Sequence, residues 1–400
     1  MIASTLLAAA GACVDRSDVG GFGADAGENA LEGGTGGAND GEAGRPTADV
    51  VPSTIRIAAG GTSTCAVDAK GGAKCWGDNL HGALGIGGFT PATSDAALAV
   101  SGISSGVRAI AGGPFSQCAI LVDGTARCWG QSLFGEIAGP GSFESVDMPS
   151  PHDKTGLSND VAQISFGVGF GCALTTKGRA KCWGSGGAGQ LGTGRTDDEL
   201  AARDVAGLDE PVVHLSASMG GLFACAVTAS GTVRCWGENG GRQLGTKTPQ
   251  NALPSPVEGL EPDVVGVGAG RSHACALYKN GGIACWGSNA DAQLGSGKTG
   301  PPSPPRKVAG VEAATELFVG SDHACAIVAD RSTLCWGSNL GGEVGPTPGP
   351  LAPTVTFPAT FGAVAIGAGF NHTCAINAQS MVSCVGSSSR KQTGTQTFSL

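Results

Sequence analysis

Fourteen of the 15 cysteines in this 400-residue chain fall into seven pairs, and the two members of each pair are always ten residues apart. The pairs are Cys65 and Cys75, Cys118 and Cys128, Cys172 and Cys182, Cys225 and Cys235, Cys275 and Cys285, Cys325 and Cys335, and Cys374 and Cys384. A turn lies inside each pair, as at Lys177-Gly178 in "CALTTKGRAKC". Glycine at this point suits the left-handed backbone that closes a short hairpin.

The spacing favours disulfide chemistry. An even spacing across a hairpin places both cysteines opposite one another on the same face, with Cα atoms about 4.5 Å apart in a non-hydrogen-bonded pair. That separation is within disulfide range, so we predict seven cross-strand disulfides. Zinc binding and buried free thiols are the alternatives, but no CxxC and no second ligand pair accompanies the cysteines. We therefore expect neither a metal nor another cofactor.

Residues typical of catalysis are sparse. The chain has no GxSxG, HExxH or P-loop motif. Three of its six histidines, His273, His323 and His372, share one position, two residues before the first cysteine of a pair. This regularity favours a turn-stabilising role over a ligand role. We expect no catalytic residues and no enzymatic activity.

Candidate binding residues lie just after a glycine that precedes every first cysteine by five positions. In the proteins that this repeat resembles, as described below, such loops line one face of a ring around the mouth of its channel. We predict a binding surface with an apolar and a polar arc, the apolar one suited to a protein partner. Its residues are Phe115, Phe170, Leu222 and Phe223 in the apolar arc, and Arg271, His273, Asp322, His323, Asn371 and His372 in the polar arc. The alternative is that the phenylalanines fold inward and plug the channel.

These residues belong to a repeated unit. Successive second cysteines are 53, 54, 53, 50, 50 and 49 residues apart. Alanine always follows the first cysteine, and tryptophan follows the second in six copies, with Val385 in the seventh. The 70 glycines and 21 prolines, together with short apolar runs, predict an all-β chain of short strands and tight turns.

The repeat resembles that of the regulator of chromosome condensation family, through segments such as "CWGSNADAQLG" (Cys285 to Gly295) and "CWGSGGAGQLG" (Cys182 to Gly192). The resemblance implies a seven-bladed β-propeller with four-stranded blades, which we place at residues 51–400. The tryptophans would then form the core between blades. We expect the tail "TQTFSL" to pair beside the first blade, near "STIRIAAG".

The start of the chain indicates export. Residues 1–13, "MIASTLLAAAGAC", resemble a lipoprotein signal that ends at Cys13, the one cysteine outside the pairs. Residues 14–50 hold eight acidic and two basic residues and few large apolar ones, which predicts a disordered acidic Gly-rich linker. We expect lipidation of Cys13 and an outer-membrane or cell-surface lipoprotein, or otherwise a secreted or periplasmic protein.

Charge and composition narrow the partners. The net charge of −9 and the lack of a basic stripe argue against nucleic acid, and no apolar run long enough to span a membrane follows residue 13. We therefore expect a monomeric, non-enzymatic, exported recognition scaffold that binds a protein, and perhaps a polymer, and that meets the membrane only through a lipid anchor. The alternatives are a guanine-nucleotide exchange factor-like regulator of a small GTPase and a propeller-face hydrolase or lyase.

Overall fold

The computed structural model describes residues 55–400, apart from 138–144, 155, 346–348, 350 and 396. The described residues form 28 strands in seven four-stranded antiparallel sheets, and all lie within one compact unit, Arg45–Leu400. Each sheet is one repeat in chain order and is called a blade. The expected signal segment 1–13 and linker 14–50 lie outside the described residues.

The strands of blades 1 to 4 have the following bounds. Blade 1 contains β1 Ile57–Ala59, β2 Ser63–Val67, β3 Ala73–Asp78 and β4 Thr93–Ala99. Blade 2 contains β5 Val107–Gly112, β6 Ser116–Leu121, β7 Ala126–Ser132 and β8 Val146–Asp153. Blade 3 contains β9 Val161–Gly167, β10 Phe170–Thr175, β11 Ala180–Gly184 and β12 Glu199–Asp204. Blade 4 contains β13 Val212–Ala217, β14 Phe223–Thr228, β15 Val233–Glu238 and β16 Gln250–Pro256.

Blades 5 to 7 follow the same plan. Blade 5 contains β17 Val264–Ala269, β18 His273–Tyr278, β19 Ile283–Asn289 and β20 Gly300–Lys307. Blade 6 contains β21 Ala314–Val319, β22 His323–Val328, β23 Thr333–Gly337 and β24 Leu351–Phe357. Blade 7 contains β25 Ala363–Ala368, β26 His372–Asn377, β27 Met381–Gly386 and β28 Thr397–Ser399.

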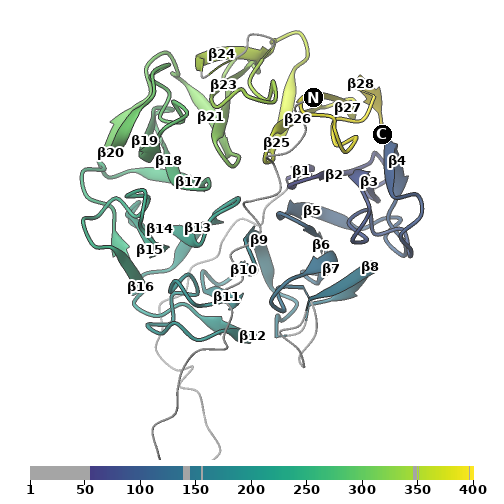
Figure 1. The fold of residues 1–400 in the computed structure, drawn as a ribbon, viewed down its shortest axis with the longest axis horizontal. Coiled ribbons are helices and arrows are strands. Elements are labelled where there is room, and N and C mark those ends of the chain that lie inside the picture. The colour runs from purple at the N-terminus through teal and green to yellow at the C-terminus, as the bar shows by residue number, and fades with distance from the viewer. Residues whose placement is uncertain (1–54, 138–144, 155, 346–348, 350, 396) are drawn as a thin grey trace, which may run out of the picture. The chain divides into compact units, whose positions relative to one another are not determined.

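The blades are arranged radially around a central axis, and the first strand of each lies innermost (Figure 1). The innermost strands of all seven blades line an axial cavity of about 170 Å³. The fold is therefore the all-β, seven-bladed propeller predicted from the repeats. Among the described residues, no helix is long and apolar enough to cross a membrane.

The hydrophobic core lies between blades rather than within them. In a typical cluster, Trp286 of blade 5 packs with Cys225 and Cys235 of blade 4, and all three side chains are fully buried. The Trp286 indole N–H also donates to the backbone oxygen of Gln243 in blade 4 (2.8 Å). Since a four-stranded sheet has two apolar faces, each blade is stable only when it lies between two neighbours. The predicted core role of the tryptophans is confirmed.

All seven predicted disulfides are present. Each joins the second and third strands of a blade at directly opposed positions, as in the pairing of Cys172 with Cys182 in blade 3. The Cα atoms of this pair are 4.1 Å apart. The hairpin register thus places the two thiols against one another in every repeat.

The C-terminal tail does not pair with the first blade as expected. Strand β28 instead hydrogen-bonds to β27 as the outer strand of blade 7, with Ser399 opposite Met381. The tail reaches blade 1 through side chains, since the ring of Phe398 meets Trp76 edge to face at 5.1 Å between centroids. The seam between the last and first blades is consequently closed by packing and hydrogen bonds rather than by a shared strand.

Candidate binding face

One face of the propeller carries two sets of loops. The inner loops join the first and second strands of each blade, and the outer loops join the third and fourth. The hairpins that join the second and third strands lie at the opposite ends of the strands. The predicted binding residues all belong to the inner loops or to the strand starts that follow them.

The inner loops are hydrogen-bonded to one another around the axis. The amide of Arg271 donates to the oxygen of Ser321 (2.8 Å), and the amide of Ser321 donates to that of Gly369 (3.1 Å). On the other side of the ring, the amide of Gly61 donates to the oxygen of Gly113 (3.2 Å). These bonds join consecutive blades and fix the loops as a rigid collar.

The repeat glycine is required by this close approach. A Cβ on Gly320 would lie 2.5 Å from the oxygen of Gly369, and one on Gly369 would lie 2.4 Å from the oxygen of Gly60. Any larger residue would push neighbouring blades apart. The repeated glycine therefore reflects blade packing rather than a ligand.

The side chain of Phe370 lies across the channel mouth. A Cβ built on Gly61 of blade 1 would lie 3.3 Å from its ring, and one on Gly220 of blade 4 would lie 3.4 Å from it. The ring thus reaches from blade 7 to blades on both sides of the axis. Phe370 is not among the residues predicted from the sequence, although it directly follows the repeat glycine of the seventh copy.

The expected exposure of Phe170 and Phe223 is wrong. Both side chains are fully buried, and each packs in a core cluster between two blades. The Phe170 ring covers Gly167, since a Cβ there would come within 1.9 Å of it. These phenylalanines fill the space between blades rather than the channel.

The assignment of the three repeat histidines to a binding surface is also wrong, since all three are fully buried. Burial lowers the pKa of each of His273, His323 and His372 to about 3. His372 Nε2 lies 2.8 Å from Thr64 Oγ1 in blade 1, and His323 Nε2 lies 2.9 Å from Thr373 Oγ1 in blade 7. These contacts join neighbouring blades, as expected of structural groups.

Arg271 and Asp322 do come together on the rim. Arg271 is exposed and its guanidinium lies 2.9 Å from the Asp322 carboxylate. The hydroxyl of Ser321 donates to the same carboxylate (2.8 Å). Burial, and then the charge of Asp322, raise the pKa of Asp291. Arg271 thus neutralises part of the negative charge that Asp291 and Asp322 place between blades 5 and 6.

The other predicted residues keep access to solvent. Asn371 is exposed, while Phe115 and Leu222 are half-buried. They lie in blades 7, 2 and 4 respectively. A binding role for these three residues, and for Arg271 and Asp322, stays a prediction.

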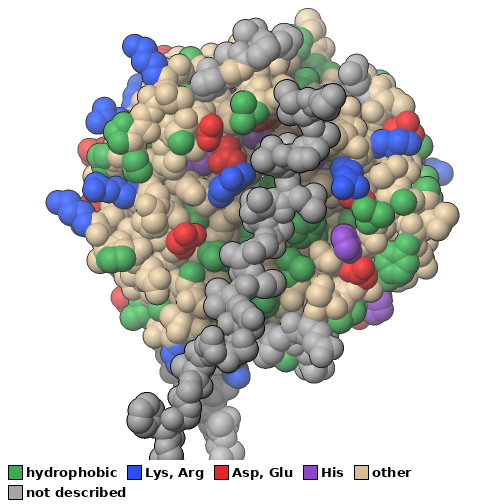
Figure 2. All heavy atoms as spheres, in the orientation of Figure 1, with side chains coloured by type: hydrophobic (Ala, Val, Ile, Leu, Met, Phe, Trp, Pro, Cys, Tyr) green, Lys and Arg blue, Asp and Glu red, His purple; other side chains and the backbone are tan. Residues whose placement is uncertain are grey.

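The outer loops contain exposed apolar residues that were not predicted from the sequence. Leu80 and Phe89 lie in blade 1, Phe134 in blade 2 and Leu340 in blade 6. We name the three residues of blades 1 and 2 the outer-loop patch. Hydrophobic side chains lie on the surface over these two blades at the right of Figure 2. A signal was available, because Leu80 and Leu340 share one repeat position, five residues after the second cysteine.

Among the described residues, no three histidine, cysteine, aspartate or glutamate side chains are grouped to hold a metal ion.

Comparison with known families supports this description of the repeats. Residues 230–277 and 280–327 match the "Regulator of chromosome condensation (RCC1) repeat", and residues 161–190, 212–243 and 264–293 match a second family of the same description. Human "E3 ubiquitin-protein ligase HERC2" is 32% identical over 221 residues, 54% of this chain and 4% of that protein. The "Ultraviolet-B receptor UVR8" of Arabidopsis thaliana is 30% identical over 209 residues, 52% of this chain and 46% of that protein. The chain thus spans less than half the length of these relatives.

Solved structures share the fold. Human WBSCR16 superposes with a TM-score of 0.71 at 21% identity, over 83% of this chain and 89% of that one. Prp20p from Saccharomyces cerevisiae superposes with a TM-score of 0.68 at 21% identity, over 84% and 83%. The chain is therefore a seven-bladed β-propeller that contains regulator of chromosome condensation (RCC1) repeats and carries one disulfide in each blade.

Proposed function

We propose that this propeller is a non-enzymatic recognition scaffold that binds a protein partner through its loop face. The observation that carries the proposal is the outer-loop patch, in which Leu80 is 47% and Phe134 is 39% exposed. Large apolar side chains held in solvent on ordered loops are typical of interaction surfaces. Aromatic residues among them are the most frequent energetic anchors.

The rigidity of the face supports the same function. The collar of inner loops and the disulfide in each blade restrict the loops before any partner arrives. A surface that is already ordered loses little conformational entropy on binding, so a few anchors suffice for useful affinity. Phe134 is further held by its contact with blade 3, where a Cβ on Gly169 would come within 2.4 Å of its ring.

The compartment follows from the disulfides. Seven of them indicate an oxidising, extracytoplasmic location, since cytosolic thiols are kept reduced. Within that location we propose an anchored lipoprotein, with Cys13 as the lipidated residue. Cys13→Ser should then move the protein from the membrane fraction to the soluble fraction of the native host, and unchanged fractionation would count against the anchor.

A propeller of this fold can serve as a binding platform, since the solved structure of Prp20p is described together with its binding to Gsp1p and histones. Nucleotide exchange on a GTPase finds less support here than partner binding in general. Nucleotide exchange on such a GTPase takes place in a reducing compartment, in which seven disulfides would not persist. We therefore propose a partner that resides outside the cytoplasm.

The test is a quantitative capture experiment in the native host. Wild-type protein is compared with the double variant Leu80→Ser and Phe134→Ala, and with Val122→Ser as the control. Val122 lies on the hairpin side of blade 2 and is 72% exposed, so its replacement leaves the loop face intact. We expect capture of a partner by wild type and control, and at least a tenfold loss with the double variant, since each anchor contributes about 1–3 kcal/mol. Equal capture by all three proteins would refute the loop face as the binding surface.

A further inference from the structure

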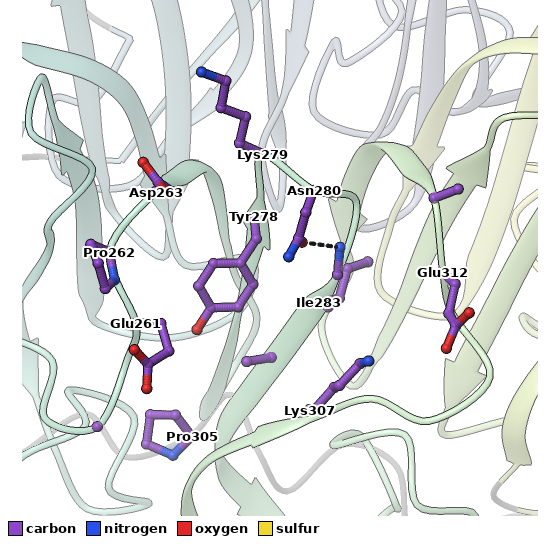
Figure 3. Close-up of a pocket in the computed structure, with 14 residues that line it drawn as sticks. Glu261, Pro262, Asp263, Tyr278, Lys279, Asn280, Ile283, Pro305, Lys307 and Glu312 are labelled. Carbon is purple, nitrogen blue, oxygen red and sulfur yellow. Dashed lines mark hydrogen bonds between the residues drawn. The ribbon is translucent and has the colours of Figure 1, made fainter.

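The hairpin side of blade 5 lies away from the loop face. A pocket of about 880 Å³ opens there between the loop that leads into β17, the β18–β19 hairpin and strand β20 (Figure 3). Its wall contains Tyr278, the only tyrosine of the chain, with Pro262 and Pro305 nearby. This volume lies in the range of small-molecule sites in proteins.

The pocket contains Ala284 at a repeat position that is filled by a long basic side chain in the first four blades. The position directly before the second cysteine is Lys74, Arg127, Lys181 and Arg234 in blades 1 to 4. Three of these side chains form ion pairs within their own blade: Lys74 with Asp68 (4.0 Å), Arg127 with Asp153 (2.9 Å) and Lys181 with Asp204 (3.1 Å).

Blade 5 lacks the ion pair that the residue before the second cysteine forms in blades 1 to 3. Ala284 is paired across the sheet with Lys307, whereas Arg127 of blade 2 is paired with Asp153. Alanine ends at Cβ, so the space that a basic side chain would cover stays open. The small side chain of Ala284 thus helps to leave the pocket open, together with the loops that line it.

The lining combines an aromatic ring with polar groups of both signs. Tyr278 is half-buried, packs against the core cluster of blades 4 and 5, and has a raised pKa because of that burial. In Figure 3 Glu261 and Lys307 are drawn below its ring, one to each side. Glu261, Asp263 and Glu312 supply carboxylates, and Lys279 and Lys307 supply ammonium groups. The rim therefore carries three acids and two bases.

A peptide cannot extend the sheet at this edge. The outer strand β20 reads "GPPSPPRK" and contains four prolines, which lack the amide hydrogen needed to pair with an added strand. Recognition in the pocket must rely on side chains. This separates the site from the strand-addition mode by which many sheets bind peptides.

We propose that the blade 5 pocket binds an uncharged oligosaccharide, with one sugar ring stacked on Tyr278. A sugar offers an apolar C–H face to an aromatic ring. Its hydroxyl groups can donate to carboxylates such as Glu261 and accept from ammonium groups such as Lys307. Because the rim charges nearly cancel, neither an anionic nor a cationic ligand is favoured over a neutral one.

The test is calorimetric titration of the purified protein with cellotetraose, maltotetraose, mannotetraose and chitotetraose. We expect at least one of them to bind, and both Tyr278→Ala and Ala284→Arg to weaken that binding by at least about tenfold. Ala284→Arg introduces the arginine that blades 2 and 4 have at this position, so it should fill the pocket without unfolding the blade. Leu334→Arg, at the same position of blade 6, is the matched control and should bind like the wild type.

Three results would overturn the proposal. One is the absence of binding to all four oligosaccharides. Another is binding that persists unchanged in Ala284→Arg. The third is that a proline-rich peptide, titrated in parallel, binds in the same pocket while the sugars do not, which would assign the site to a peptide. Because the pocket lies on the hairpin side, the outcome of this titration is independent of partner binding at the outer-loop patch.

Discussion

At the scale of single residues, the buried histidines show how neighbouring blades are joined. The Thr64 hydroxyl donates its one hydrogen to the backbone oxygen of Gln392 (2.9 Å). It must then accept from His372, so the Nε2 atom of His372 carries a hydrogen. Thr373 makes the same pair of contacts, to the oxygen of Glu343 and to His323. The neutral imidazole therefore acts as a fixed donor across the blade interface.

His273 differs from the other two histidines in its neighbour. Blade 6, which follows it, has Ala324 at the repeat position where blades 1 and 7 have threonine. Both ring nitrogens of His273 lack a hydrogen-bond partner among the described residues. Blades 3 and 4 have Phe170 and Phe223 at the same repeat position, and the Phe170 ring lies over Gly167 as the His273 ring lies over Gly270. We predict that His273→Phe is tolerated and stabilises the fold at neutral pH, because it removes two unsatisfied buried nitrogens. Chemical denaturation at pH 7.5 measures this.

The same variant should change the pH dependence of stability. The folded pKa of His273 is about 3, below the value of about 6.5 in an unfolded chain. Below about pH 6.5 the unfolded state binds a proton that the folded state does not, so stability falls as the pH drops toward 3. The slope is about 1.4 kcal/mol per pH unit for each such histidine. The free energy of unfolding of His273→Phe should fall less steeply than that of wild type between pH 6 and pH 4.5, and parallel curves would contradict the assignment.

At the scale of elements, the cross-linked hairpin is the stable unit of each blade. Its disulfide closes a loop of ten residues and its sulfur atoms belong to the core shared with the next blade. The chain segments around it are short and glycine-rich, so they contribute little helical or strand propensity of their own. The cross-link offsets part of the conformational entropy that such a chain loses on folding.

Removal of one cross-link should therefore have a measurable cost. We predict that the double variant Cys225→Ala and Cys235→Ala loses about 2–3 kcal/mol of unfolding free energy, from the entropy of a ten-residue loop in the unfolded state. Denaturant titration of the oxidised proteins measures the difference. In a strong reductant the gap between wild type and variant should narrow, since wild type then loses this cross-link as well. A gap that persists unchanged would assign the effect to packing.

At the scale of the whole molecule, stability depends on closing the ring. Six blade interfaces join segments that follow one another in the chain, whereas the seventh joins blade 7 to blade 1. That interface contains the contact of Phe398 with Trp76, the Thr64–His372 bond and an indole bond from Trp76 to the oxygen of Gln392 (2.9 Å). No strand crosses from one blade to the other, so side-chain contacts hold this seam together with one inner-loop bond, from the amide of Phe370 to the oxygen of Gly60 (3.3 Å).

We predict that Phe398→Ala lowers the unfolding free energy by about 1–3 kcal/mol and that the loss appears first at the seam. Hydrogen exchange should accelerate in β1 and β28 before it changes elsewhere. Phe361→Ala is the matched control, because Phe361 packs against Phe357 at 5.8 Å between two consecutive blades. If both variants exchange faster at the same places, the seam is no weaker than the other interfaces.

The sequence by itself determined the number of blades, the position of each hairpin and the pairing of all fourteen cysteines. These features are local: a spacing of ten across a turn sets the register, and seven copies in phase set the count. Even the role of Trp286 followed from its fixed place in the repeat. The pairing of the C-terminal tail was not determined in this way, because strand β28 pairs within its own blade and not with blade 1.

Only the tertiary structure decided which loop residues face solvent. Phe115 and Phe170 read alike in the sequence, but the first is half-buried on the rim and the second is fully buried between blades. One position along a strand reverses the direction of a side chain, and the neighbouring blade then buries whatever points toward it. The pocket beside Ala284 depends in the same way on two loops and a strand that meet only when blades 4, 5 and 6 pack together. Contacts between blades, which no single repeat encodes, therefore set the surface of this protein.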